Sequence, residues 1–370
     1  MPGWRNWAPW LVLTLLGVSP LSRGGEATQT ADQRDSRYPH RSIRGQEVGS
    51  GPRSYWLFEP AEPRPAQAPV VVFLHGWLSI NPGIYGAWIE HLTRSGHVVV
   101  APRYQEGWTT PPADFLPNTV AAVRDALDVL ETAPDRVRPD RDRFALIGHS
   151  AGGNLAAQLA SVARSSGLPV PKALVSVMPG EVIPSTWPKL SEIPSEVRLA
   201  VVAAEEDVVV GDERARQIYQ KTVAVPDDQK LFVLYRSDRR GAPALVADHL
   251  APTAGLAWLD TGEGPFREFQ MARATVNALD IDGLWRLADL TLHAGFADLD
   301  LPTVTQSGAL LRDLGRWSDG RPVRSPLVAV GQKIDAFPRV VPVYGLRLVP
   351  WPSVPALSSA DPARLFPKND

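Results

Sequence analysis

The stretch Phe144-Ala145-Leu146-Ile147-Gly148-His149-Ser150-Ala151-Gly152-Gly153 decides the fold. Its first four residues form a short apolar run typical of a strand buried on both faces, and residues 154–162 behind it have helical periodicity. Between them, Gly148-His149-Ser150-Ala151-Gly152 fits the pattern G-x-S-x-G. A serine on a sharp strand-to-helix turn has strained backbone geometry, and only small residues fit beside it. The pattern therefore predicts an exposed, reactive Ser150. The alternative is a glycine-rich turn that only packs helix on sheet.

Apolar runs and helical segments alternate on both sides of this stretch. The expected strands are 70–74, 98–100, 173–177, 199–203 and 231–234, and the expected helices include 84–94, 120–130 and 212–219. This alternation predicts an α/β fold, with a mostly parallel sheet flanked by helices on both faces. Two further helices, 266–279 and 284–293, form a C-terminal extension, and residues 300–345 lack clear alternation. We expect one domain over residues 53–349 that includes the extension.

The N-terminus predicts export. Arg5 gives a positive start, residues 7–21 are apolar, and small residues stand at Gly25 and Ala27. We therefore predict a signal peptide over residues 1–27 and a secreted or periplasmic protein. The apolar run is short and interrupted by prolines, which argues against a stable membrane span, so an uncleaved membrane anchor is the minor alternative.

Composition narrows the function classes. The polar residues 28–52 predict a flexible leader, and the proline-rich residues 350–370 predict a disordered tail. The chain has no cysteine, which excludes disulfides, thiolate metal sites and a cysteine nucleophile. A net charge of −2 with mixed signs leaves no basic stripe for nucleic acid. With no H-E-x-x-H motif and no P-loop lysine, we expect no metal and no cofactor. The oligomeric state stays open.

A serine hydroxyl needs a base to remove its proton, and the seven histidines of the chain are the candidates. On a strand–turn–helix serine the base comes later in the chain, with an acid between the two. That order leaves His249 and His293. His249 follows the strand at 231–234 by a loop, whereas His293 belongs to an amphipathic helix and suits a surface or packing role. We predict His249 as the base.

The acid should follow the preceding strand, where Glu205-Glu206-Asp207 stands. Asp207 is the last acid before an apolar run, and its short side chain suits a fixed imidazole partner. Glu205 and Glu206 are alternatives. Asp212 is more simply a helix N-cap, and Asp248 a loop residue, because neighbours in a loop rarely point at one another.

His75-Gly76-Trp77 ends the first apolar strand. A loop at this place supplies one backbone N–H to a developing oxyanion, and the residue after the nucleophile supplies the other. We predict the N–H groups of Trp77 and Ala151 in these roles. The Trp77 side chain either lines an acyl pocket or simply packs, and Tyr104 and Trp108 are expected to contribute walls.

The residues Val71–Tyr104, the elbow Gly148–Gly153 and the segment Arg236-Ser237-Asp238…Ala247-Asp248-His249 resemble the α/β-hydrolase superfamily. Their character is closest to the bacterial esterase, dienelactone-hydrolase and cutinase-like branches. The resemblance covers residues 55–260 and implies the α/β-hydrolase fold with a Ser-Asp-His triad. It further implies hydrolysis of a small-molecule or lipid-like carboxylic ester through an acyl-enzyme.

Several alternatives remain within and outside that reading. An amidase, peptidase or lactonase uses the same triad, and a ligand-binding or structural pseudoenzyme keeps the fold without it. Two features depart from compact family members: residues 250–370 follow the histidine where one helix would suffice, and no disulfide is present. The connection between residues 177 and 198 is short, which predicts an open site unless the C-terminal helices cover it.

Overall fold

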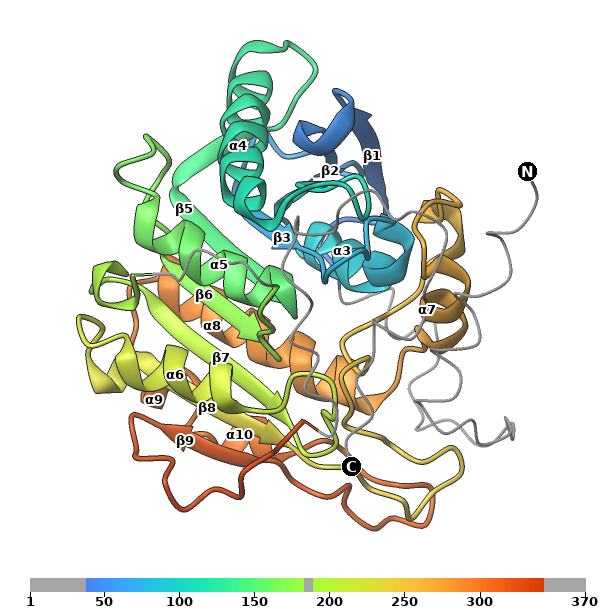
Figure 1. Ribbon diagram of the computed structural model, residues 1–370, viewed down its shortest axis with the longest axis vertical. Coiled ribbons are helices and arrows are strands. Elements are labelled where there is room, and N and C mark those ends of the chain that lie inside the picture. The colour runs from blue at the N-terminus through green and yellow to red at the C-terminus, as the bar shows by residue number, and fades with distance from the viewer. Residues whose placement is uncertain (1–37, 183–188, 343–370) are drawn as a thin grey trace, which may run out of the picture.

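The computed structural model describes residues 38–182 and 189–342, and these build a single nine-stranded sheet in the order β1-β2-β4-β3-β5-β6-β7-β8-β9 (Figure 1). The central pairings from β4 to β8 are parallel. The edge pairings β1–β2, β2–β4 and β8–β9 are antiparallel. Helices cover both faces (Figure 1), which confirms the predicted α/β class.

The elements have the following bounds. The strands are β1 (Ile43–Val48), β2 (Tyr55–Pro60), β3 (Gln67–Leu74), β4 (Val98–Pro102), β5 (Arg138–His149), β6 (Ala173–Val177), β7 (Arg198–Ala204), β8 (Lys230–Tyr235) and β9 (Leu327–Val330). The α-helices are α3 (Gly86–Arg94), α4 (Phe115–Thr132), α5 (Ala151–Val162), α6 (Glu213–Lys221), α7 (Arg267–Arg273), α8 (Arg286–Phe296), α9 (Leu301–Val304) and α10 (Ala309–Arg312). The short helices are η1 (Gly51–Arg53), η2 (Pro82–Tyr85), η3 (Pro112–Asp114), η4 (Leu190–Glu192), η5 (Asp227–Gln229), η6 (Ala257–Leu259) and the π-helix η7 (Leu279–Trp285).

The apolar runs of the central strands reflect burial on both faces. Successive side chains of a strand point to opposite faces, so Val70 and Val72 of β3 join the core under α4, α5 and α6. Val71 and Phe73 of the same strand join the core under α3 and α8. A strand that contacts two hydrophobic layers has no polar face, which is why the sequence shows continuous apolar runs there.

The first strand corrects the predicted leader. Residues 28–52 were expected to be flexible, but residues 43–48 form β1 and pair with β2 in continuous register from Ile43–Pro60 to Val48–Tyr55. The four middle residues of β1 are exposed. An edge strand is held by backbone hydrogen bonds on one side, and its side chains are free to be polar. The polar composition of residues 28–52 therefore gives no sign of this strand.

The ends of the chain carry the remaining predictions on targeting. The predicted signal peptide (1–27), residues 28–37 and the predicted tail (350–370) lie outside the described residues. Within residues 38–182 and 189–342, no helix has both the length and the apolar character needed to cross a membrane.

The C-terminal extension contains helices close to the two expected ranges, with different boundaries. The first, α7, ends at Arg273, and the π-helix η7 runs directly into α8. Asn277 starts this second helix because its Oδ1 accepts the Leu279 N–H at 2.8 Å, while Asp280 Oδ2 accepts the Asn277 N–H at 2.8 Å. This is a reciprocal capping arrangement. Downstream, β9 extends the sheet beside β8, where the sequence showed no clear alternation.

Asp280 gives a pH-dependent stability prediction. It is fully buried, Oδ1 has no hydrogen-bond partner among the described residues, and burial raises the pKa of Asp280 well above its usual value. Because the raised pKa means that the folded protein binds this proton more tightly than the unfolded chain does, stability falls as pH rises from the ordinary carboxyl range through the raised pKa. Asp280→Asn keeps an acceptor for Asn277 and removes the titration. We expect this variant to unfold at a higher temperature than the wild type at pH 8. Each kcal/mol gained in the free energy of unfolding should raise the unfolding temperature by roughly 2–4 °C.

Thermal unfolding of both proteins at pH 5 and pH 8 measures this effect. The difference in unfolding temperature should shrink at pH 5, because keeping the buried carboxyl protonated costs less free energy at lower pH. Asp228→Asn, at an exposed aspartate, is the matched control and should show no such pH dependence. An equal difference at both pH values would contradict the buried-carboxyl explanation.

Candidate active site

Strained backbone marks one edge of the sheet. Four non-glycine residues with positive φ each follow a neighbouring central strand: Leu78 (62°) after β3, Tyr104 (39°) after β4, Ser150 (57°) after β5 and Met178 (44°) after β6. Such conformations cost about 1–3 kcal/mol each and cluster at functional sites. In open α/β sheets, ligands bind outside the carboxyl ends of the strands. The backbone alone therefore places the candidate site at this edge.

The elbow has the geometry that its glycines predict. Ser150, between β5 and α5, has φ 57° and ψ −123°. A Cβ on Gly148 would lie 2.1 Å from the Gly152 carbonyl oxygen, and one on Gly152 would lie 2.1 Å from the Leu74 carbonyl oxygen. No side chain fits at either position, so the G-x-S-x-G spacing is a packing requirement as well as a backbone one.

Three side chains from three strand ends form a hydrogen-bonded chain. His249 Nε2 lies 2.9 Å from Ser150 Oγ, and His249 Nδ1 lies 2.8 Å from Asp207 Oδ2. Asp207 is fully buried, and its other oxygen accepts the N–H groups of Val209 at 3.1 Å and Val210 at 3.0 Å. The structure thus brings together the predicted nucleophile, base and acid.

Each of the other acids considered for this role forms an ion pair with an arginine. The ion pairs are Glu205–Arg324, Glu206–Arg239, Asp212–Arg216 and Asp248–Arg273. None of these carboxylates has a described contact with His249. His293 is exposed on α8. Asp212 does precede α6, but its side chain bonds Arg216 at 2.6 Å instead of capping the helix.

His149 lies beside the base. Its ring centroid is 4.9 Å from that of His249, and its Nδ1 is 2.9 Å from the Tyr85 hydroxyl. Burial lowers the pKa of His149 well below its usual value, and the neighbouring His249 lowers it further. The lowered pKa favours the neutral form of the His149 imidazole that packs against His249. The sequence assigned His149 only to the turn, because nothing local indicates its long-range partners.

The predicted oxyanion groups flank the serine. Gly76 abuts the nucleophile, since a Cβ there would lie 3.4 Å from Ser150 Cβ. Trp77 is the next residue, and Ala151 is the first residue of α5, whose N–H has no partner within the helix. A Cβ on Gly180 would lie 3.3 Å from Ser150 Oγ, so the missing side chain leaves space beside the hydroxyl.

The expected walls differ from one another. Tyr104 is fully buried, stacks on His75 at 4.2 Å and donates its hydroxyl to the His75 carbonyl at 2.7 Å. It supports the turn through this bond and has no accessible surface, so the prediction that Tyr104 contributes a wall is wrong. Trp108 is 48% exposed and forms an edge-to-face chain with Trp77 at 5.0 Å and Phe266 at 5.5 Å. We call Trp77, Trp108 and Phe266 the aromatic rim.

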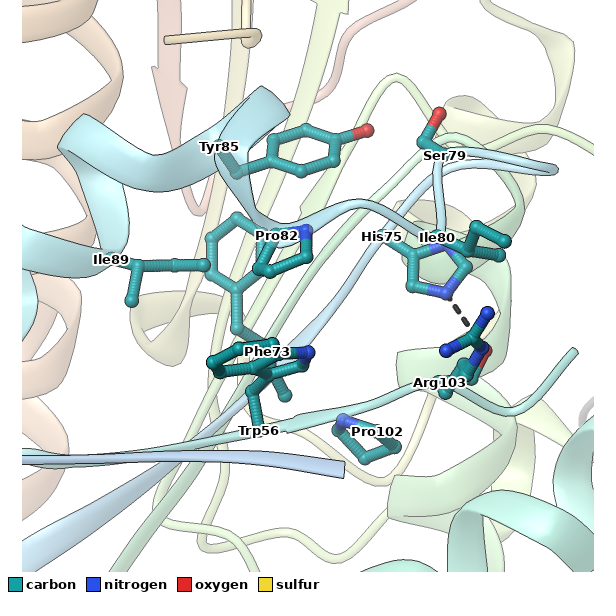
Figure 2. Close-up of a pocket in the computed structure, with 11 residues that line it drawn as sticks. Trp56, Phe73, His75, Ser79, Ile80, Pro82, Tyr85, Ile89, Pro102 and Arg103 are labelled. Atoms are coloured by element: carbon teal, nitrogen blue, oxygen red, sulfur yellow. Dashed lines mark hydrogen bonds between the residues drawn. The ribbon is translucent and has the colours of Figure 1, made fainter. Parts of the chain in front are cut away.

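A small cavity lies beside the segment after β3, with His75 and Ser79 among its lining residues (Figure 2). It measures about 20 Å³, which is room for one water molecule and too little for a substrate. Its polar lining comes from His75, Ser79, Tyr85 and Arg103. His75 contacts two carbonyl oxygens, those of Gly76 at 2.6 Å and Arg103 at 2.9 Å. No group of three or more potential metal ligands occurs among the residues the structure describes.

Comparison with known proteins agrees with this architecture. Residues 71–247 match a family model described as alpha/beta hydrolase fold, in agreement with the parallel sheet and the serine elbow. A segment of 109 residues is 32% identical to Chlorophyllase-2 of Arabidopsis thaliana. That segment covers 29% of this chain and 33% of the plant protein, so the chain matches about a third of its relative. The described residues thus have the α/β-hydrolase fold, and residues 71–247 are similar to that family.

Proposed function

We propose that this protein hydrolyses carboxylic esters through an acyl-enzyme, with Ser150 as nucleophile, His249 as general base and Asp207 as the orienting acid. The observation that carries the proposal is the pair of hydrogen bonds of 2.9 and 2.8 Å that joins the three side chains. A ligand-binding protein has no need of this arrangement on a strained elbow. A hydrolase uses each part of it.

The chemistry follows from the geometry. Ser150 Oγ attacks the carbonyl carbon while its proton moves to His249 Nε2, and the carbonyl oxygen gains the charge. The N–H groups of Trp77 and Ala151 would bind that oxyanion. His249 then gives its proton to the departing alcohol, and an ester bond to Ser150 replaces the substrate ester. A water molecule, deprotonated by the same imidazole, releases the acid and restores the serine.

A screen of p-nitrophenyl esters from acetate to palmitate, together with matched p-nitroanilides and a lactone, tests this function. Ser150→Ala is the control, and a fluorophosphonate probe reports a reactive serine independently of the substrate. We expect ester turnover and labelling in the wild type only. Labelling with faster anilide turnover would favour an amidase or peptidase, and preferred lactone turnover a lactonase. No labelling and no turnover would favour a pseudoenzyme.

The aromatic rim predicts a preference for apolar esters. Trp108 stands in its middle with nearly half of its side chain exposed, and an aromatic contact contributes about 0.5–1.5 kcal/mol beyond area burial. We expect Trp108→Ala to raise KM for a phenyl or long-chain ester by roughly 5- to 30-fold, with kcat changed little. The acetate ester should be affected least.

Trp258→Ala is the matched control for this measurement. Trp258 is 56% exposed, and none of the ring contacts among the described residues involves it. Trp258→Ala should leave KM unchanged for the phenyl, long-chain and acetate esters. A uniform KM increase across the series, or an equal effect of Trp258→Ala, would remove the rim from substrate binding.

A further inference from the structure

The turn that carries the predicted oxyanion donor is strained. The Ser79 N–H bonds the Gly76 carbonyl at 3.0 Å and closes a four-residue turn over residues 76–79. Its third residue, Leu78, is fully buried and has φ 62°, a conformation that non-glycine residues rarely adopt. Strained turns persist only where their surroundings hold them, so the contacts of this turn decide where the Trp77 N–H points.

Tyr85 holds the first residue of the turn. Its hydroxyl accepts the Gly76 N–H at 3.0 Å and lies 2.9 Å from His149 Nδ1. The side chain is fully buried, and burial raises the pKa of Tyr85 to about 12, so the group stays a phenol. Its hydroxyl lies on the same side of the pocket as that of Ser79 (Figure 2), and a Cβ on Gly76 would lie 3.1 Å from the first and 3.3 Å from the second. One hydroxyl thus links the turn to the elbow.

Gln270 holds the last residue of the turn. Its side-chain amide donates to Ser79 Oγ at 2.7 Å, and both groups are buried. Gln270 lies on α7, in the C-terminal extension that follows His249. Gln270 and Tyr85 therefore hold the two ends of the turn beside the nucleophile, Ser79 and Gly76, and Gln270 does so from the C-terminal extension.

The segment that carries Gln270 is docked by other contacts as well. Its backbone pairs with η2 and α3 through Leu256 N–Gly83 O and Ala87 N–Ala254 O, both 2.9 Å. Asp260 accepts the Asn81 amide at 2.6 Å. Because these bonds fix the segment without the Gln270 side chain, the loss of that amide should alter the turn without undocking α7.

We propose that Tyr85 and Gln270 are positioning residues that act through Ser79 and Gly76 to hold the Trp77 N–H against the developing oxyanion. The C-terminal extension is then part of the catalytic apparatus, although it supplies no reacting group. This inference rests on the proposed ester hydrolysis. It predicts losses in the chemical step and not in substrate binding, because Tyr85, Ser79 and Gln270 are buried.

The test compares Tyr85→Phe and Gln270→Met with Tyr235→Phe. Tyr235 is the matched control, since its hydroxyl is equally buried and has no hydrogen-bond partner among the described residues. Steady-state kinetics on p-nitrophenyl butyrate should show kcat lowered about 10- to 100-fold in both variants, with KM within twofold, because a displaced donor costs less than the 10²–10³ of a deleted one. Tyr235→Phe should keep the wild-type kcat.

The double variant separates positioning from general loosening. Because both residues hold one turn, Tyr85→Phe with Gln270→Met should lose little more kcat than Tyr85→Phe alone. Hydrogen exchange of the peptide containing residues 76–79 should speed up in each variant, a readout that needs no activity. Unchanged kcat in both variants beside an active wild type, or a rise in KM alone, would overturn the inference. An inactive, unlabelled wild type would instead overturn the proposed function.

Discussion

Ser150→Ala is expected to abolish ester hydrolysis, with kcat lowered by about 10⁶-fold, the scale seen when a triad nucleophile is removed. Without Oγ no acyl-enzyme can form, and His249 has no proton to accept from the elbow. The remaining rate should come from binding and the oxyanion groups, which alone retain a modest acceleration over water. The change removes one hydroxyl and little packing, so the fold should persist.

Kinetics on the preferred ester, probe labelling and thermal unfolding together measure this result. Ser165→Ala, at an exposed serine beyond α5, is the matched control and should label and turn over like the wild type. Turnover above a few per cent in a folded Ser150→Ala protein would exclude Ser150 as the nucleophile.

The elements around the nucleophile were predictable because each has a local cause. Gly148 and Gly152 are required, because a Cβ at either position would make contacts below 2.5 Å. The turn can therefore be recognised from the sequence pattern. A parallel sheet also brings the ends of its strands to one edge, which is why residues that follow different strands can meet there. Asp207 and His249 come directly after β7 and in the loop after β8, and the strands were recognisable as apolar runs.

The features that the sequence did not reveal depend on distant partners. The polar strand β1 is stabilised by backbone pairing with β2, which no side-chain pattern records. Gln270 meets Ser79 across 191 positions, and Tyr85 meets His149 across 64. Tyr104 looked like a wall because it follows a strand end, yet its positive φ turns the ring under His75. Local chemistry identifies the reacting groups, whereas tertiary packing selects the residues that position them.

Asp207→Asn is expected to lower kcat by about 10⁴-fold while the protein stays folded. The reason lies in the two oxygens of Asp207. Oδ1 accepts two backbone N–H groups, from Val209 and Val210, so an asparagine would keep its carbonyl there and direct its NH₂ at His249 Nδ1. An imidazole that accepts at Nδ1 carries its proton on Nε2. That nitrogen then faces Ser150 as a donor and cannot remove the serine proton.

Asp212→Asn is the matched control, because it makes the same chemical change at another buried aspartate that follows β7. Asp212 forms a fully buried ion pair with Arg216, which also donates to the carbonyl oxygens of Ile334 and Pro338. Removing one charge of a buried pair typically costs about 3–5 kcal/mol, so this variant should lose thermal stability and keep the kcat of its folded fraction. Kinetics and unfolding on both variants separate the two effects. A 10⁴-fold loss of kcat in folded Asp212→Asn, with Asp207→Asn active, would move the orienting role to Asp212, despite the 2.8 Å contact between Asp207 and His249.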